Sequence, residues 1–98
     1  MDYKAENKTI TIFLNGRIDA GNTAETESEI NDLLIGYTDC EPVIDAKGLE
    51  YISSAGLRML MKMSRKISGR LKVINCADEV YEIFEVTGFT DIFDISRA

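Results

Sequence analysis

The sequence predicts an α/β domain: a mixed sheet of four to five strands, with three to four helices packed mainly on one face. Two patterns support this fold class. Short β-branched runs alternate along the chain with segments whose apolar residues recur every three or four positions. The connections between them are short, as in crossover units that pair parallel strands. The 98 residues are therefore expected to form a single domain, residues 1–98.

Strands are expected where apolar or β-branched residues form short runs. In "KTITIFLNG", threonine and phenylalanine alternate with isoleucine and leucine, a period of two that is typical of a strand, here ending at Gly16. A second apolar run follows Pro42 and indicates a buried strand. The expected strands are residues 9–16, Val43 to Ala46, Leu71 to Asn75 and residues 91–95, with an optional N-terminal strand at Tyr3 to Glu6.

The first and third helices carry start and stop signals. Asn22 and Glu25 have the spacing of a capping box, so the first helix should begin near Asn22 and stop at Gly36. Asp78 should cap the third helix, which should end near Gly88. The expected inward faces are Thr26, Ile30, Leu33, Leu34 and Tyr37 in the first helix and Val80, Ile83, Phe84 and Thr87 in the third.

The second helix begins in the stretch "YISSAGLRMLM". The helical pattern starts at Leu57, Gly69 should end it, and the Ser54 hydroxyl should cap it, which contributes ~1 kcal/mol. Ala55 and Gly56 leave the first turn bare, although glycine inside a helix costs about 0.5–1 kcal/mol relative to alanine. We expect this bareness to let another molecule approach Ser54 from outside. The expected inward face is Leu57, Leu60, Met61, Ser64 and Ile67.

Composition excludes several classes of function. The formal net charge of −6 argues against binding to nucleic acid or to an anionic membrane surface. No apolar run reaches the roughly 20 residues that span a bilayer, and "MDYKAENKT" lacks the apolar core of a signal peptide, so we expect a cytoplasmic protein without membrane insertion. In that compartment Cys40 and Cys76 should be reduced thiols.

The residues also argue against an enzyme. The chain contains no histidine, the commonest general base and metal ligand. Neither Ser53 nor Ser54 has a glycine two positions before it, as the nucleophile elbow requires, and only a serine–lysine pair with Lys47 or Lys62 is formally left. No spacing for a metal site or a phosphate-cradling loop occurs, so no cofactor or metal is expected.

Three segments together resemble the STAS domain family, the sulphate-transporter and anti-sigma-factor-antagonist domains. They are "LNGRIDAGNTAE", "VIDAKGLEYISSAGLRMLM" and "LKVINCADEVYEIFEVTGFTDIFDI", and their order and spacing cover nearly the whole chain. The resemblance implies a single STAS domain, residues 1–98, with the fold of an anti-sigma factor antagonist.

The resemblance also implies a function. In stand-alone bacterial members, the serine just before the x-G-L turn is phosphorylated by a partner kinase that is also an anti-sigma factor. The unphosphorylated domain binds that anti-sigma factor and frees the sigma factor, and phosphorylation releases the domain. Ser54 matches the phosphorylated serine, and Ser53, where relatives often carry aspartate, is the second choice. Asp19 matches an acidic loop residue near the serine and the partner. We expect a serine phosphatase as a further partner and a monomer when free.

The solvent side of the second helix carries four basic residues and no acidic ones. This basic stripe is Arg58, Lys62, Arg65 and Lys66. It is either ordinary solubilising charge or a surface that meets an acidic patch on the partner and steers docking. Arg58, four residues after Ser54, is within reach of a phosphate there. Met59 and Met63 border the stripe, as peripheral core or as adaptable contact residues. The expected partner-binding residues are Asp19, Asn22, Thr23, Ser53, Ser54, Gly56, Leu57, Arg58, Met59 and Lys62.

Two alternatives stay open at this point. The same switch could control an output other than a sigma factor. A small STAS subunit of a lipid-transport ABC complex would use the same fold as a scaffold. The intact "SSAGL" segment, with its acceptor-type serine, favours the switch.

Overall fold

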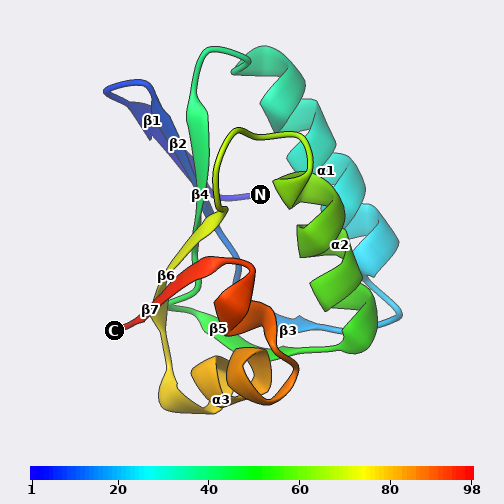
Figure 1. The fold of residues 1–98 in the computed structure, drawn as a ribbon. Helices are drawn as coiled ribbons and strands as arrows, with labels where there is room; N and C mark the ends of the chain where they lie inside the picture. Colours follow the sequence, from blue (N-terminus) through cyan, green and yellow to red (C-terminus); the bar gives the residue numbers. More distant parts are fainter.

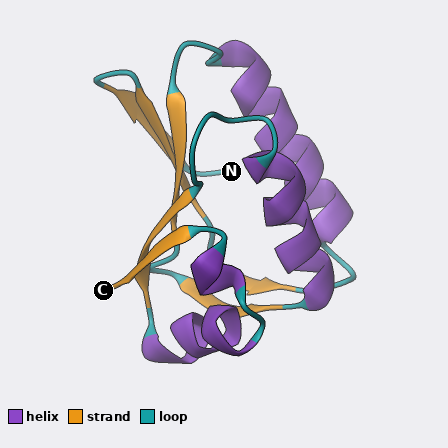
Figure 2. Ribbon diagram, viewed as in Figure 1, coloured by secondary structure: helices purple, strands orange, loops and turns teal.

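The computed structural model describes residues 1–98 as seven strands, three α-helices and one 3₁₀ turn (Figures 1 and 2). The strands are β1 Tyr3–Glu6, β2 Thr9–Phe13, β3 Gly16–Ile18, β4 Glu41–Asp45, β5 Leu49–Ile52, β6 Lys72–Cys76 and β7 Asp94–Arg97. The helices are α1 Thr23–Gly36, α2 Ser54–Ser64 and α3 Asp78–Val86, and the 3₁₀ turn is η1 Phe89–Asp91.

Five strands form one mixed sheet in the order β1-β2-β4-β6-β7. β1 runs antiparallel to β2, and every other neighbouring pair is parallel, with Ile44 of β4 opposite both Ile12 of β2 and Val73 of β6. β3 and β5 pair in parallel as a separate two-stranded sheet. The predicted fold class is confirmed, including the optional N-terminal strand, because the parallel pairs are joined through helices as crossover units require.

Helices cover one face of the main sheet. α1 and α2 lie side by side on that face, and α3 lies at one end of the molecule below β3 and β5 (Figure 1). In β2 burial alternates, because Ile10 and Ile12 are buried while Thr9 and Thr11 point to the open face and are half-buried. β4 is buried from Pro42 to Asp45. The largest fully buried side chains include Ile10, Ile12, Ile44, Val73, Leu60, Phe84 and Phe93.

The small β3–β5 sheet was not predicted, and it changes how α2 packs. The buried residues of α2 are Gly56, Leu57, Met59, Leu60 and Met63. The predicted inward face is confirmed at Leu57 and Leu60 and wrong at Met61 and Ser64, which are only half-buried. Gly56 packs on the small sheet at Ile18 and Ile52, and Met59 faces the start of α1 across the groove between the two helices.

Several predicted boundaries are also corrected. β2 ends at Phe13 because Gly16, at φ 71°, already begins β3. α2 ends at Ser64 rather than Gly69, and the Ser64 hydroxyl donates to the Met61 carbonyl at 2.7 Å. The last strand is β7, three residues later than expected, because residues 89–91 form the η1 turn.

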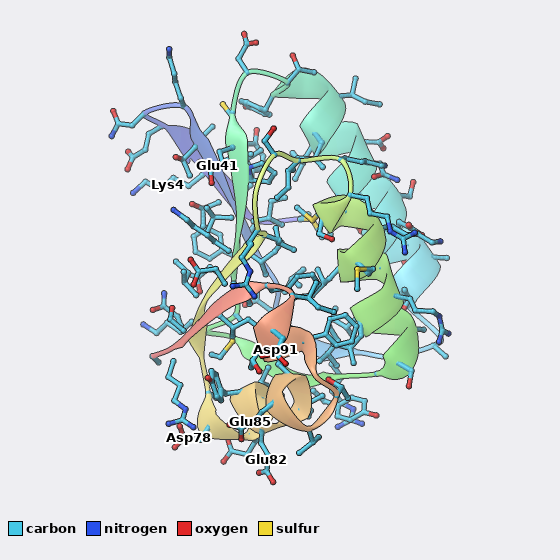
Figure 3. The ribbon with its side chains drawn as sticks, in the orientation of Figure 1. Lys4, Glu41, Asp78, Glu82, Glu85 and Asp91 are labelled. Carbon is cyan, nitrogen blue, oxygen red and sulfur yellow. The ribbon has the colours of Figure 1, made fainter.

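Of the predicted helix ends, some are confirmed and others are corrected. α1 ends at Gly36 as predicted, and Gly88 adopts the left-handed φ of 82° just after α3. Asp78 is the first residue of α3 and not its cap, since Ala77 occupies that position without a side-chain bond. The acidic side chains of α3, among them Glu82 and Glu85, project away from the core (Figure 3).

Candidate functional site

The starts of α1 and α2 lie next to each other. β3 leads into α1 and β5 leads into α2, and the two strands are parallel with Ile18 opposite Ile52. The pairing continues past both strands, where the Ser53 N–H donates to the Ile18 carbonyl at 2.8 Å. Because the carboxyl ends of parallel strands meet at one edge, the loop at Asp19 comes beside the two serines.

Ser53, and not Ser54, caps α2. Its backbone is extended, with φ −85° and ψ 173°, and its Oγ accepts a hydrogen bond from the Gly56 N–H at 3.3 Å. The predicted cap is therefore wrong by one residue, because the bond to Ile18 holds Ser53 in the extended conformation that an N-cap needs. Ser54 is the first helical residue, it is exposed, and its hydroxyl makes no hydrogen bond within the protein.

The bare first turn of α2 serves packing. A Cβ at Gly56 would lie 2.6 Å from Cγ1 of Ile52 and 2.9 Å from Cγ2 of Ile18. Only glycine therefore lets α2 rest on the β3–β5 sheet. The expected open space at Gly56 is corrected, because the room that glycine provides is on the buried side and not on the side of an approaching molecule.

Two further members of the expected partner-binding set belong to the core. Leu57 is 5% exposed and Met59 is 3% exposed, and Met63 beside them is 4% exposed. Burial of this degree excludes broad contact with a partner, so both methionines are core residues. Gly56 and Leu57 therefore support the surface from below, and Met59, although buried, still lines the groove between α1 and α2.

The loop before α1 is fixed by its own side chains. Asp19 Oδ1 accepts from the Gly21 N–H at 2.9 Å and from the Asn22 N–H at 3.2 Å. Asn22 Oδ1 accepts from the Asp19 N–H at 2.9 Å, and its Nδ2 donates to the Arg17 carbonyl at 2.7 Å. The Thr23 hydroxyl donates to the Asp19 carbonyl. Asn22 occupies the N-cap position of α1, but its side chain holds the loop instead of the helix.

The basic stripe of α2 is partly neutralised by α1. Lys62 Nζ lies 3.7 Å from Glu27 Oε2, and Lys66 Nζ donates to Asn31 Oδ1 at 3.2 Å. Arg58 and Arg65 are exposed and form no ion pair. Between α1 and α2 runs a groove of about 280 Å³, with Ala20, Thr23 and Ala24 on one side and Ala55, Arg58 and Lys62 on the other.

Arg17 and Tyr51 join the site, and the sequence reasoning missed them. Arg17 of β3 lies opposite Tyr51 of β5, with its guanidinium carbon 4.4 Å from the ring centroid. Since side chains alternate along a strand, this pair shares the outer face of the small sheet with Asp19 and Ser53. The signal that could have found them is the polar–apolar alternation on both sides of Ile18 and Ile52.

The buried polar groups around Asp45 make contacts within the protein. Buried Asp45 accepts from the Asn75 side-chain amide at 3.0 Å and from the Lys47 N–H at 2.9 Å. Burial, and then the charge of Asp45, raises the pKa of the Cys76 thiol to about 11. No three histidine, cysteine, aspartate or glutamate side chains come together as metal ligands, and no helix has the length and apolarity to cross a membrane.

Comparison with known proteins decides the family. The family described as "STAS domain" matches residues 1–98, the whole chain. The chain belongs to the STAS domain family. The domain is 29% identical to the anti-sigma-B factor antagonist of Bacillus subtilis over 98% of this chain and 89% of that protein.

Solved structures of similar proteins have the same fold as this STAS domain. An anti-sigma factor antagonist from Mycobacterium paratuberculosis superposes with a TM-score of 0.81 at 19% identity, covering 98% of this chain and 83% of that one. The anti-sigma factor antagonist SpoIIAA in its unphosphorylated form gives a TM-score of 0.78 at 17% identity, covering 99% of this chain and 86% of that one. Both confirm the predicted STAS architecture.

Proposed function

We propose that this STAS domain is an anti-sigma factor antagonist that works by partner switching in the cytoplasm. Unphosphorylated, it binds an anti-sigma factor that is also a serine kinase, and so frees the sigma factor. Phosphorylation of Ser54 releases it, and a serine phosphatase resets it. It has no catalytic activity of its own, and it is a monomer when free. The observation that carries the proposal is the exposed, unbonded hydroxyl of Ser54 at the first position of α2.

The two serines differ in a way that favours Ser54 as the acceptor. The Ser53 Oγ is engaged with the Gly56 N–H, and Ser53 is half-buried, whereas the Ser54 Oγ is free. A kinase that modified Ser53 would have to displace the helix cap. A phosphate on Ser54 would stand at a helix N-terminus, where the helix dipole favours anions, so the modified domain should stay folded.

The transfer itself is chemically simple. The Ser54 Oγ forms a bond to the γ-phosphorus of ATP while the bond from that phosphorus to the β–γ bridging oxygen breaks, and ADP leaves. The serine proton passes to a base of the kinase. The domain supplies only the acceptor and gains roughly −1.5 to −2 charges at pH 7. The added negative charge repels the partner, or the phosphate clashes with it, at the docking surface.

The docking surface that we propose combines Ser54 with the loop at Asp19 and with the solvent side of α2. Asp19, Asn22 and Thr23 form a rigid loop beside the serines, and Arg58 and Lys62 follow along α2. The supported part of the partner-binding set is thus Asp19, Asn22, Thr23, Ser53, Ser54, Arg58 and Lys62. Charge of one sign along α2 steers an acidic partner toward Ser54.

The acceptor is tested with kinases that have a histidine-kinase-like ATP-binding fold and come from the same genome. Each is incubated with ATP and the wild-type domain, Ser53→Ala or Ser54→Ala, and the phosphate is mapped by mass spectrometry. We expect one phosphate on the wild type and on Ser53→Ala, and none on Ser54→Ala. A phosphate on Ser53 of the wild type would overturn the assignment. So would an unmodified domain beside a kinase that is active on another antagonist.

Binding to the same kinase tests the switch. Ser54→Ala should keep the affinity of the wild type, and Ser54→Asp should weaken it, because the new charge faces the partner. Ser96→Asp is the matched control, since Ser96 is an exposed serine on β7, away from the site. Equal affinity of Ser54→Ala and Ser54→Asp would contradict a charge-based switch.

A further inference from the structure

The strongest uncommitted charge near the site is Arg58. It lies one helical turn after Ser54 on the same side of α2. Side chains in a helix tilt toward its N-terminus, so the Arg58 side chain leans back toward the first turn. Arg58 is exposed and takes part in no ion pair and no cation–π contact. Its guanidinium is therefore free to take a new partner.

An open groove lies between Arg58 and the start of α1. The groove of about 280 Å³ is lined by the small side chains of Ala20, Ala24 and Ala55, together with Thr23, Glu27, Arg58, Met59 and Lys62. Its second cation, Lys62, already pairs with Glu27 at 3.7 Å. Arg58 is thus the one uncompensated charge that lines the groove.

Acidic groups near the groove do not compete strongly for Arg58. The first turn of α2 contains no acidic residue. The Asp19 carboxylate accepts from two backbone N–H groups of its own loop, at 2.9 and 3.2 Å, and Glu27 faces Lys62. A phosphate on Ser54 would be the first anion carried by α2 itself within one turn of Arg58.

We infer that Arg58 binds the phosphate on Ser54 by a charge-assisted ion pair across the first turn of α2, beside the groove between α1 and α2. This inference rests on the proposed function, because it needs a phosphate on Ser54. Arginine offers several N–H donors to the oxygens of one phosphate, and the order acid first, base four residues later is the favourable one in a helix. The pair withdraws Arg58 from the basic stripe. Modification therefore adds negative charge and also removes one positive charge from the docking surface.

The test uses the full chain with phosphoserine placed at position 54 during translation, so that no kinase is required. The phosphate pKa is read from its phosphorus-31 resonance during a pH titration. An ion pair favours the dianion, so replacing Arg58 with glutamine should raise this pKa by at least about 0.3 units. Arg65→Gln removes the same charge eleven residues after Ser54, about 16 Å along the helix. It should raise the pKa by less than about 0.1 units, because salt screens over about 8 Å.

The side chain provides an independent measurement. In the phosphorylated domain, the Nε–Hε resonance of Arg58 should shift relative to the unmodified domain, and that of Arg65 should not. Equal pKa changes in Arg58→Gln and Arg65→Gln would reduce the effect to the general field of the helix and overturn the ion pair. An unchanged pKa in Arg58→Gln would overturn it as well.

These results are separable from the proposed function. If Arg58 fails this test while a kinase still modifies Ser54, the switch stands and only the ion pair is wrong. If no kinase modifies Ser54 although the ion pair forms with translated phosphoserine, the proposed function fails instead.

Discussion

At the scale of single residues, side chains of the same type have different surroundings in the fold. Cys40 is half-buried, whereas Cys76 is 1% exposed beside Asp45. Tyr37 donates a hydrogen bond to the Tyr3 hydroxyl, which holds the pKa of Tyr37 above its usual value. Ser53 and Ser54 differ more consequentially, since one hydroxyl caps a helix and the other is free.

Cys76 makes stability depend on alkaline pH. Its thiol keeps its proton up to a pKa of about 11 in the folded state, against 9.0 ordinarily. Between these values the unfolded state loses the proton first, so stability should fall as pH rises, by up to about 1.4 kcal/mol per unit. Urea unfolding of the wild type and of Cys76→Ala checks this. The wild type should lose more stability than the variant over that range. Parallel losses would contradict it.

Gly56 is the residue that we expect to tolerate substitution least. Gly56→Ala should destabilise the domain by about 1–3 kcal/mol, because the new methyl group overlaps Ile18 and Ile52. Gly36→Ala is the control: Gly36 ends α1 and has nothing within 4 Å of a new Cβ. It should be neutral or slightly stabilising. Thermal unfolding compares the two, and equal melting temperatures would show that the packing at Gly56 relaxes freely.

At the scale of elements, the sequence patterns predicted the three helices and the strands of the main sheet and missed the two strands of the small sheet. The alternation in β2 extends over five residues, but β3 has three residues and β5 has four. Those two strands exist because Ile18 and Ile52 pair across more than thirty residues of chain. No local pattern contains that information. The capping residue was missed for the same reason, since the partner that fixes Ser53 is in β3.

The cap gives a prediction with an internal control. Ser53→Ala should cost about 1 kcal/mol of stability, because the Gly56 N–H loses its acceptor. Ser54→Ala removes a free hydroxyl from the surface and should change stability by less than about 0.5 kcal/mol. Chemical denaturation of both variants measures the difference. A larger loss in Ser54→Ala would mean that Ser54 is the cap after all.

At the scale of the whole molecule, charge is distributed unevenly. The basic stripe lies on α2 and on the two residues that follow it, while α3 presents Asp78, Glu79, Glu82 and Glu85 at one end of the molecule (Figure 3). The fold class and the place of the serine pair at the start of the second helix were predictable, because both follow from patterns along the chain. The pairing of Lys62 with Glu27 was not, since it depends on α1 and α2 lying side by side.

The basic stripe predicts how fast the partner docks. Lys62→Glu together with Arg65→Glu should slow association with the kinase that modifies Ser54, and the effect should shrink as salt rises from about 0.05 M to about 0.5 M. Lys72→Glu is the control, because Lys72 is exposed on β6 of the main sheet, away from α2. Stopped-flow association rates measure this. An unchanged rate of the double variant at low salt would leave the stripe with a solubilising role only.

The bond between Ser53 and Ile18 has a kinetic consequence. It ties the start of α2 to the neighbouring strand, and the Gly56 N–H closes the same turn. Under the proposed function, a phosphate on Ser54 is added to a turn that these two hydrogen bonds already hold. We therefore expect the switching rate to follow the kinase, the phosphatase and the off-rate of the complex, without a slow rearrangement of this turn.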